Sequence, residues 1–255
     1  IGGVEHAVLH LLYARFFTKA LRDCGYWSID EPFSGLYTQG MITHATYRDS
    51  EGNWCNPADI VTDEKEGGYI RRDNRLAVTE GAVAKMSKSK KNTIDPQAII
   101  ESYGADAARL FILSDSPPDR DLEWSEAGLE GAWKFINRVY RMAMEPVLEL
   151  PEAGTQMPAQ FSESATRLRQ EAHRAVRDVD HYIANFHMNK AVARIRELAN
   201  AISDFNAAEE RQDGIEGDRY GLWEALKNLI RLLAPVTPHF AEELWAELGA
   251  KQLLV

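Results

Sequence analysis

K-M-S-K-S-K-K-N, residues Lys85–Asn92, is the stretch of this sequence from which the rest of the fold can be worked out. Four lysines fall within seven positions, spaced by Ser87 and Ser89, and the helix-start pair Asp95-Pro96 follows. This pattern predicts a mobile cationic loop, and such a loop suits a polyanionic ligand. A solvated surface charge run is the alternative, but the regular serine spacing and the capped helix behind it favour a binding loop.

The bulk composition bounds the classes of protein that this chain can be. Its 255 residues are 45% hydrophobic and 27% charged, which is typical of globular proteins. The formal net charge of −10 argues against a protein whose whole surface binds nucleic acid, so any such contact must be a local patch. Cys24 and Cys55 are isolated, which predicts neither a disulfide framework nor a zinc ribbon and fits the cytoplasm.

Membrane and targeting segments are not expected, because no stretch has the pattern of a membrane span or a signal peptide. The sequence starts within an apolar, glycine-containing run and stops without the character of a tail. We therefore expect it to be part of a longer polypeptide.

The first 23 residues predict a long helix that ends at Cys24-Gly25. A glycine pair opens it, and at a helix N-terminus a bare backbone can approach an anion closely. His6 and His10 fall on one face, one turn apart. They are either a structural pair or two ligands of a zinc ion. No cysteine or further histidine lies nearby, so no metal is expected.

Residues 26–82 predict β structure in two parts. The run Leu36–Ile42 indicates a buried parallel strand, with Gln39 where an open α/β sheet presents ligand groups. Residues 46–82 indicate a small β excursion, with two short strands around a turn in Tyr47–Trp54. No catalytic pattern lies in the excursion, so we expect it to support the loop that follows.

The remainder predicts helices. Asp95 should cap a helix that Gly104 closes, and Asp106 should cap Ala107–Leu113. From Ser125 onward five amphipathic helices are expected in an antiparallel bundle, the last with Thr237 as its N-cap. Their expected core positions are Leu129, Ala132, Trp133, Ile136, Tyr140; Leu168, Ala172, Ala175, Val179, Ile183; Val192, Ile195, Leu198, Ala199, Ile202; Leu222, Leu226, Leu229, Ile230, Leu233; and Phe240, Leu244, Trp245, Leu248.

The bundle sequence has no catalytic constellation, but it is rich in arginine. Such side chains can contact RNA phosphates, although arginines on helix surfaces mostly pair with neighbouring acids. The candidates are Arg167, Arg169, Arg174, Arg177, Arg194, Arg196 and Arg231.

Several segments resemble a known family. Lys85–Ser89 is identical to the second signature of class I aminoacyl-tRNA synthetases. Residues 2–16, G-G-V-E-H-A-V-L-H-L-L-Y-A-R-F, are similar to the segment that follows the editing insertion of leucyl-tRNA synthetases, and residues 46–82 resemble their leucine-specific insertion. Residues 103–114 resemble the stem-contact segment of the class. The first signature, of His-x-Gly-His type, and editing-domain features are absent.

The resemblance implies an α/β plus all-α fold. Residues 1–45 would form the second half of a Rossmann-like class I catalytic domain, 46–82 the small β insertion, 83–117 the signature loop and stem-contact segment, and 118–255 a helical anticodon-binding-type domain. It also implies a reaction, the ATP-dependent activation of leucine and its transfer to tRNA(Leu).

The resemblance also implies roles for single residues and ligands. Lys85 and Lys88 would be catalytic, and His6 and His10 would line the leucine pocket. Gly3, Glu5, Gln39 and Lys88 would contact ATP or the adenylate. ATP would be a substrate accompanied by Mg²⁺, with no metal held by the protein. Leucine, tRNA(Leu) and the rest of the polypeptide (an N-terminal catalytic half, an editing domain and a C-terminal domain) would be the partners, without a membrane.

Two alternative functions stay open. One is a non-catalytic helical RNA-binding or assembly module with a remnant nucleotide site, which the intact lysine set and the set Glu5, His6, His10 and Gln39 disfavour. The other is a synthetase for another aliphatic amino acid, which the Glu5-His6 pair and Lys90-Lys91 disfavour. The chain alone is expected to be inactive, because half of the ATP cradle is missing.

Overall fold

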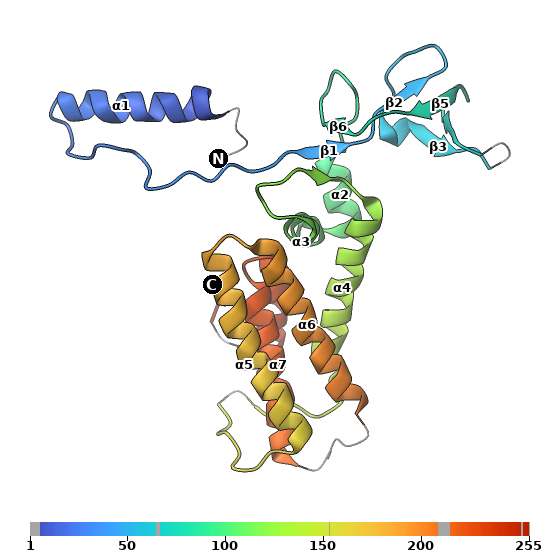
Figure 1. The fold of residues 1–255 in the computed structure, drawn as a ribbon. Helices are drawn as coiled ribbons and strands as arrows, with labels where there is room; N and C mark the ends of the chain where they lie inside the picture. Colours follow the sequence, from blue (N-terminus) through green and yellow to red (C-terminus); the bar gives the residue numbers. More distant parts are fainter. Residues whose placement is uncertain (1–5, 65–66, 153, 209–214, 251, 255) are drawn as a thin grey trace. The chain divides into compact units, whose positions relative to one another are not determined.

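Two compact units make up the fold (Figure 1). The structure is a computed structural model that describes residues 6–64, 67–152, 154–208, 215–250 and 252–254. One unit comprises the chain up to Ile94 together with Pro118–Trp124, and the other comprises Asp95–Pro117 and the chain from Ser125 onward. The chain therefore passes between the units three times. Among the described residues, no helix combines the length and apolar character that crossing a bilayer requires.

The N-terminal helix of the first unit begins as a π-helical turn, η1 (Ala7–Leu11), and continues as α1 (Leu12–Asp23). It ends where predicted, since Cys24 N–H donates to Ala20 O and Gly25 takes a φ of +81°. Its large apolar side chains are exposed. They are Val8, Leu9, Leu12, Tyr13, Phe16 and Phe17.

A three-stranded sheet of order β6-β1-β7 carries the lysine loop. Its strands are β1 (Ile42–His44), β6 (Ala84–Lys85) and β7 (Leu122–Glu123). β1 runs antiparallel to β6 and parallel to β7, with Ile42 opposite Leu122. A parallel pair needs a long crossover, which here contains a second small sheet, β6, the lysine loop and two helices.

The strand predicted at Leu36–Ile42 is wrong, because β1 begins only at the last residue of that run. Leu36 is 62% exposed, and β propensity alone forms no strand without a neighbouring strand to pair with. Gly40 N–H instead donates to Pro118 O at 2.9 Å. A side chain at Gly40 would overlap the Arg120 carbonyl, which accounts for glycine at this close approach.

Residues 47–80 form a separate antiparallel sheet of order β2-β5-β4-β3. Its strands are β2 (Tyr47–Asp49), β3 (Ile60–Thr62), β4 (Tyr69–Arg71) and β5 (Ala77–Glu80), with a 3₁₀ turn η2 (Pro57–Asp59) before β3. The predicted β excursion is confirmed. The second strand expected before Trp54 is only a single bridge between Arg48 and Trp54.

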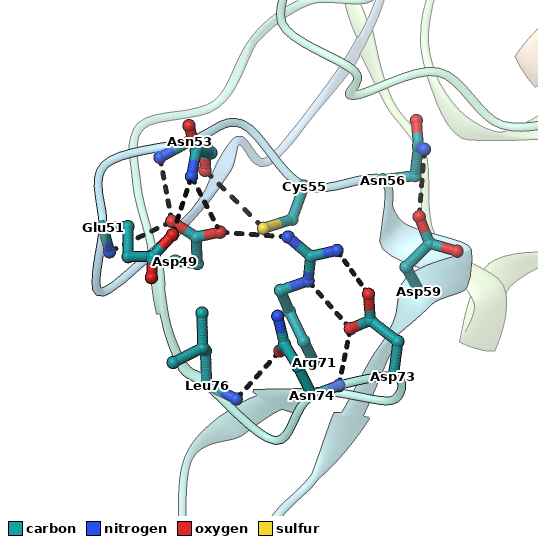
Figure 2. A network of polar contacts seen from close by, with 10 residues as sticks. All are labelled: Asp49, Glu51, Asn53, Cys55, Asn56, Asp59, Arg71, Asp73, Asn74 and Leu76. Atoms are coloured by element: carbon teal, nitrogen blue, oxygen red, sulfur yellow. Dashed lines mark hydrogen bonds and ion pairs between the residues drawn. The ribbon is translucent and has the colours of Figure 1, made fainter.

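A buried carboxylate holds this small sheet together (Figure 2). Asp49 accepts hydrogen bonds from the backbone N–H groups of Glu51 and Asn53 at 3.1 and 2.9 Å, and Arg71 donates to it at 3.1 Å. Burial acts to raise the pKa of Asp49, but the hydrogen bonds from Asn53 and Arg71 outweigh it and lower the pKa below its usual value. The carboxylate therefore stays ionised inside the fold.

The second unit begins with α2 (Pro96–Tyr103) and α3 (Ala105–Asp115). The Asp95 cap is confirmed, since its carboxylate accepts from Gln97 N–H at 3.0 Å. The cap predicted for Asp106 is wrong. Its carboxylate accepts at 2.7 Å from Phe240 N–H, in the first turn of a helix more than 130 residues away in the sequence.

Five further helices complete the unit, as predicted: α4 (Glu126–Met144), α5 (Glu163–Ala184), α6 (Met188–Ala207), α7 (Glu216–Leu233) and α8 (Pro238–Glu247). α5 packs against α6 and α7, and α3 packs against α4 and α6. Arg109 of α3 donates to the carbonyls of Pro235 and Val236 at 3.0 Å, which fixes α3 to the turn before α8.

The predicted core positions hold for α5, α6 and α7 with the exception of the half-buried Ile183. In α4 the stripe is displaced: Trp133 and Tyr140 are exposed, while Phe135 and Val139 are buried. Both sets have helical spacing, so periodicity alone could not choose between them. In α8 only Leu244 of the four expected residues is fully buried. Thr237 occupies the N-cap position of α8 as predicted, but its hydroxyl donates to Leu233 O instead of accepting from the first turn of the helix.

Candidate functional site: a lysine loop on a sheet edge

The lysine loop, Lys85–Asn92, leaves the sheet directly from β6. Lys85 lies opposite Thr43 in the β1–β6 pair, and Met86 N–H donates to Ile42 O at 3.3 Å. The following residues, 88–91, form a turn in which Lys91 N–H donates to Lys88 O at 3.3 Å. The sheet thus fixes the start of the loop, and the turn extends beyond it.

Asn92 fixes the other end of the lysine loop. It is fully buried, and its Oδ1 accepts from Ser87 N–H at 2.9 Å. Its Nδ2 donates to the carbonyls of His44 and Ala84 at 3.2 Å and of Lys85 at 3.4 Å. One amide therefore joins both ends of the turn to both strands. Removing it would leave buried backbone groups without partners, at about 1–3 kcal/mol for each such group.

The serines of the loop contact its own backbone. Ser87 Oγ accepts from Lys90 N–H and lies 3.3 Å from Ser89 Oγ. Lys91 takes a φ of +54°, a conformation that is costly for a residue with a Cβ atom. Internal hydrogen bonds thus hold the turn, and the lysine side chains of the loop, at positions 85, 88, 90 and 91, are exposed.

A cavity of about 370 Å³ adjoins the loop. Lys90 and Ala84 line it from the loop side, and Arg48 and Trp54 line it from the small sheet. Arg48 stacks on the Trp54 ring with its guanidinium carbon 3.8 Å from the ring centre. The small sheet therefore contributes to the surroundings of the loop.

The other predicted site residues lie on two further segments. Gln39 is exposed, on the extended segment that leads into β1. His6 is half-buried, and His10 is exposed on η1 with its ring centre 6.2 Å from that of Phe33. Within the described residues, neither histidine has a hydrogen bond to the lysine loop. Gly3 and Glu5 lie outside the described residues.

Metal-ligating side chains do not gather in the part of the chain that the structure describes. His, Cys, Asp and Glu form no group there of three or more that could hold an ion. At the loop itself, the exposed ammonium groups can neutralise an anion that reaches the turn.

Two family models match this chain. Residues 75–125, which contain the lysine loop, match the class I tRNA synthetases for isoleucine, leucine, methionine and valine. Residues 166–255, which contain most of the helical bundle, match the anticodon-binding domain of tRNA ligases.

Curated relatives match over the whole chain. A leucine–tRNA ligase of Rhodospirillum centenum is 52% identical over 260 residues, and one of Rhodospirillum rubrum is 51% identical over 254 residues. Both alignments include 100% of this chain. The chain spans only about 30% of the length of these relatives.

Solved structures agree with these matches. A ternary complex of an Agrobacterium radiobacter LeuRS with tRNA and LeuAMS is 29% identical, with a TM-score of 0.71 over 99% of this chain and 28% of that one. A methionyl-tRNA synthetase of Mycobacterium tuberculosis, at 21% identity, 65% of this chain, 36% of that one and a TM-score of 0.54, shares the fold. The loop lies inside the matched model of the class I tRNA synthetases and most of the bundle inside the other, and this chain is homologous over its whole length to a segment of leucine–tRNA ligases.

Proposed function

We propose that this chain is the part of a leucine–tRNA ligase that brings the lysine loop to ATP and connects it to the tRNA-binding helices. In the first step a carboxylate oxygen of leucine attacks the α-phosphorus of ATP, the bond to the β-phosphate oxygen breaks, and leucyl-adenylate and pyrophosphate form. In the second step a terminal hydroxyl of tRNA(Leu) attacks the leucyl carbonyl, and AMP leaves.

Lys88 carries the proposed catalytic role, together with Lys85. Negative charge accumulates on the departing pyrophosphate, so a cation placed there in the transition state accelerates the step. The observation that supports this role is the Asn92 anchor, which fixes both ends of the turn while Lys88 remains exposed. Lysine suits the task because its ammonium is a point charge that a loop can move toward the phosphates.

The remaining site residues are proposed from the family resemblance. Gly3, Glu5 and Gln39 would contact ATP or the adenylate, and His6 and His10 would line the leucine pocket. Support comes from the exposure of Gln39 beside β1 and from the position of both histidines on one helical segment. A neutral imidazole can close an apolar pocket while its polar edge bonds a substrate or a water.

The domain division and the partners are part of the same proposal. Residues 1–45 complete the catalytic domain, 46–82 form the insertion, 83–117 hold the loop and stem contact, and 118–255 bind tRNA. Leucine, ATP with its Mg²⁺ and tRNA(Leu) are the ligands, and the rest of the polypeptide supplies the first signature. The reaction takes place in the cytoplasm.

Leucine-dependent exchange of pyrophosphate into ATP tests the proposal in the complete polypeptide that contains this chain. We expect Lys88→Ala to lower the exchange rate about 100-fold, the usual effect of removing one transition-state interaction. The binding of ATP in the ground state should change much less, because the proposed interaction forms as pyrophosphate departs.

Lys190→Ala is the matched control, because it removes an exposed lysine from α6 rather than from the loop. Its exchange rate should equal that of the unmodified protein. A normal rate in Lys88→Ala would contradict the role of Lys88, and exchange supported by isoleucine or valine instead of leucine would contradict the substrate.

A further inference from the structure

The arginines of the helical bundle divide into those with an acidic partner and those without. Five of the seven candidate arginines form ion pairs. This agrees with the expectation that arginines on helix surfaces mostly pair with neighbouring acids. The pairs are Arg167–Glu163, Arg169–Glu224, Arg174–Glu171, Arg177–Asp178 and Arg194 with Glu171, Asp178 and Glu197. Arg231 instead stacks on Trp245. Arg196 lacks a carboxylate partner among the described residues.

Arg196 lies beside a second arginine. Arg138 of α4 and Arg196 of α6 both approach the ring of Phe135, with their guanidinium carbons 5.4 and 4.8 Å from its centre. Arg138 Nη2 donates to Asn200 Oδ1 at 2.9 Å, while its buried Nε has no hydrogen-bond partner among the described residues. Burial and the charge of Arg138 lower the pKa of Arg196. Two like charges are thus held together without an internal counter-ion in the part of the chain that the structure describes.

These side chains line one pocket of about 330 Å³ between α4 and α6. Phe135 forms an apolar floor, and the remaining lining residues are Gly131, Lys134 and Asn200. Lys134 stands at the rim with Glu130 as its ion-pair partner at 2.8 Å, and both are well exposed. An anion in the pocket would offset the repulsion between the two guanidinium groups, whose N–H groups can donate to its oxygens.

We propose that this α4–α6 arginine pocket binds a backbone phosphate of the RNA partner. Planar guanidinium groups match the oxygens of a phosphate in pairs, which a lysine cannot do. On a chain of net charge −10, such a pocket is the kind of local patch that phosphate binding requires. Arg196 also lies within the residues that match the anticodon-binding model. The inference rests on the proposed function and adds a defined phosphate site to it.

The test measures the affinity of the complete polypeptide for tRNA(Leu) at several salt concentrations. We expect the double variant Arg138→Gln, Arg196→Gln to lower the slope of log K against log salt by about one for each phosphate that the protein no longer neutralises. That change corresponds to an affinity about fivefold weaker at 0.15 M salt. Leucine-dependent pyrophosphate exchange, which needs no tRNA, should remain as in the unmodified protein.

Arg167→Gln, Arg177→Gln is the matched control, because it removes the same formal charge from two arginines that already have acidic partners. Its salt slope should be unchanged. An unaltered slope in the pocket variant would overturn the proposal, and so would an equal drop in the control. Absence of exchange in the unmodified protein would instead contradict the proposed function. Failure of the pocket proposal and failure of the proposed function therefore give different results.

A second measurement needs no variant. Phenylglyoxal modifies accessible arginines, and mass spectrometry locates the modified residues. Bound tRNA should protect Arg138 and Arg196 several-fold, whereas pyrophosphate or ATP at millimolar concentration should not. Protection by these small anions alone would assign the pocket to a free phosphate compound and overturn the RNA contact.

Discussion

Asn92 decides the shape of the lysine loop through a single buried amide. Its contacts to Ser87, His44, Ala84 and Lys85 hold the turn on the β1–β6 pair. We expect Asn92→Ala in the complete polypeptide to lower the rate of pyrophosphate exchange about tenfold or more, because Lys88 would no longer have a fixed starting position. The KM for ATP should change less than kcat, which steady-state exchange kinetics can separate.

Asn92→Asp is the sharper comparison. It keeps the acceptor for Ser87 N–H but removes the donors to the three carbonyls, so it should resemble the alanine variant. An alanine variant with normal kcat would show that the anchor plays no part in catalysis. Thermal unfolding of both variants then reports the purely structural share of the effect.

The sequence pattern predicted a cationic loop at Lys85–Asn92 but not the role of Asn92 in holding it. The reason lies in which contacts are local in the sequence. A cationic run is visible in the residues themselves, whereas the carbonyls that Asn92 binds come from positions 44, 84 and 85 and meet only once β1 and β6 pair. For Asp106, a local role was predicted but the actual contact is distant in the sequence. Its position suggested a local cap, but the carboxylate reaches the first turn of α8.

At the scale of elements, the sheet of residues 47–80 depends on an ionised carboxylate. The pKa of Asp49 is lowered in the folded state, so its stabilising effect is complete above the ordinary value of about 3.9 and is lost as the pH falls through the folded pKa. We expect the melting temperature to fall with acidification in this range. We also expect Asp49→Asn to lower it by several degrees at pH 7 and by much less at pH 2.

Circular dichroism across pH 2–7 makes this comparison. Asp59→Asn is the control, because Asp59 is an exposed carboxylate at the end of η2, next to the same sheet, and its hydrogen bond comes from the side chain of Asn56. It should leave the pH profile unchanged. If Asp49→Asn had the same pH profile as the unmodified chain, the stabilising role of the Asp49 carboxylate would be excluded.

Helices could be predicted from the sequence much better than strands. The helical stripes of α5, α6 and α7 arise from contacts three and four residues apart, so local periodicity contains the information. The short strands depend on partners far along the chain, which local patterns do not reveal. The run Leu36–Ile42 has high β propensity, yet most of it forms no strand and Leu36 is exposed. The slip from Trp133 to Phe135 in α4 has a similar cause, since only the neighbouring helices decide which of two stripes is covered.

At the scale of the whole molecule, the N-terminal helix leaves an apolar face uncovered. Phe16, Leu12 and Val8 are 62%, 58% and 66% exposed, and a contiguous apolar face of this kind marks a packing surface. The chain also spans about 30% of its curated relatives. We therefore expect the 255 residues alone to show no leucine-dependent exchange, while the complete polypeptide is active.

Exchange by the 255-residue chain above the background without enzyme would contradict this expectation. The apolar face adds an independent readout. The chain alone should bind a hydrophobic dye more strongly than the complete polypeptide does at equal molar concentration, because in the latter the face of α1 would be covered.

The three passages of the chain between its two units have a consequence for how the protein can be divided. Strand β7 belongs to the first unit but lies, in the sequence, between helices of the second. A single break after Ile94 would leave this strand on the helical piece, where its partner β1 is missing. Neither half could then fold to completion by itself, and a gene split at this point would give two polypeptides that complement each other by exchanging one strand.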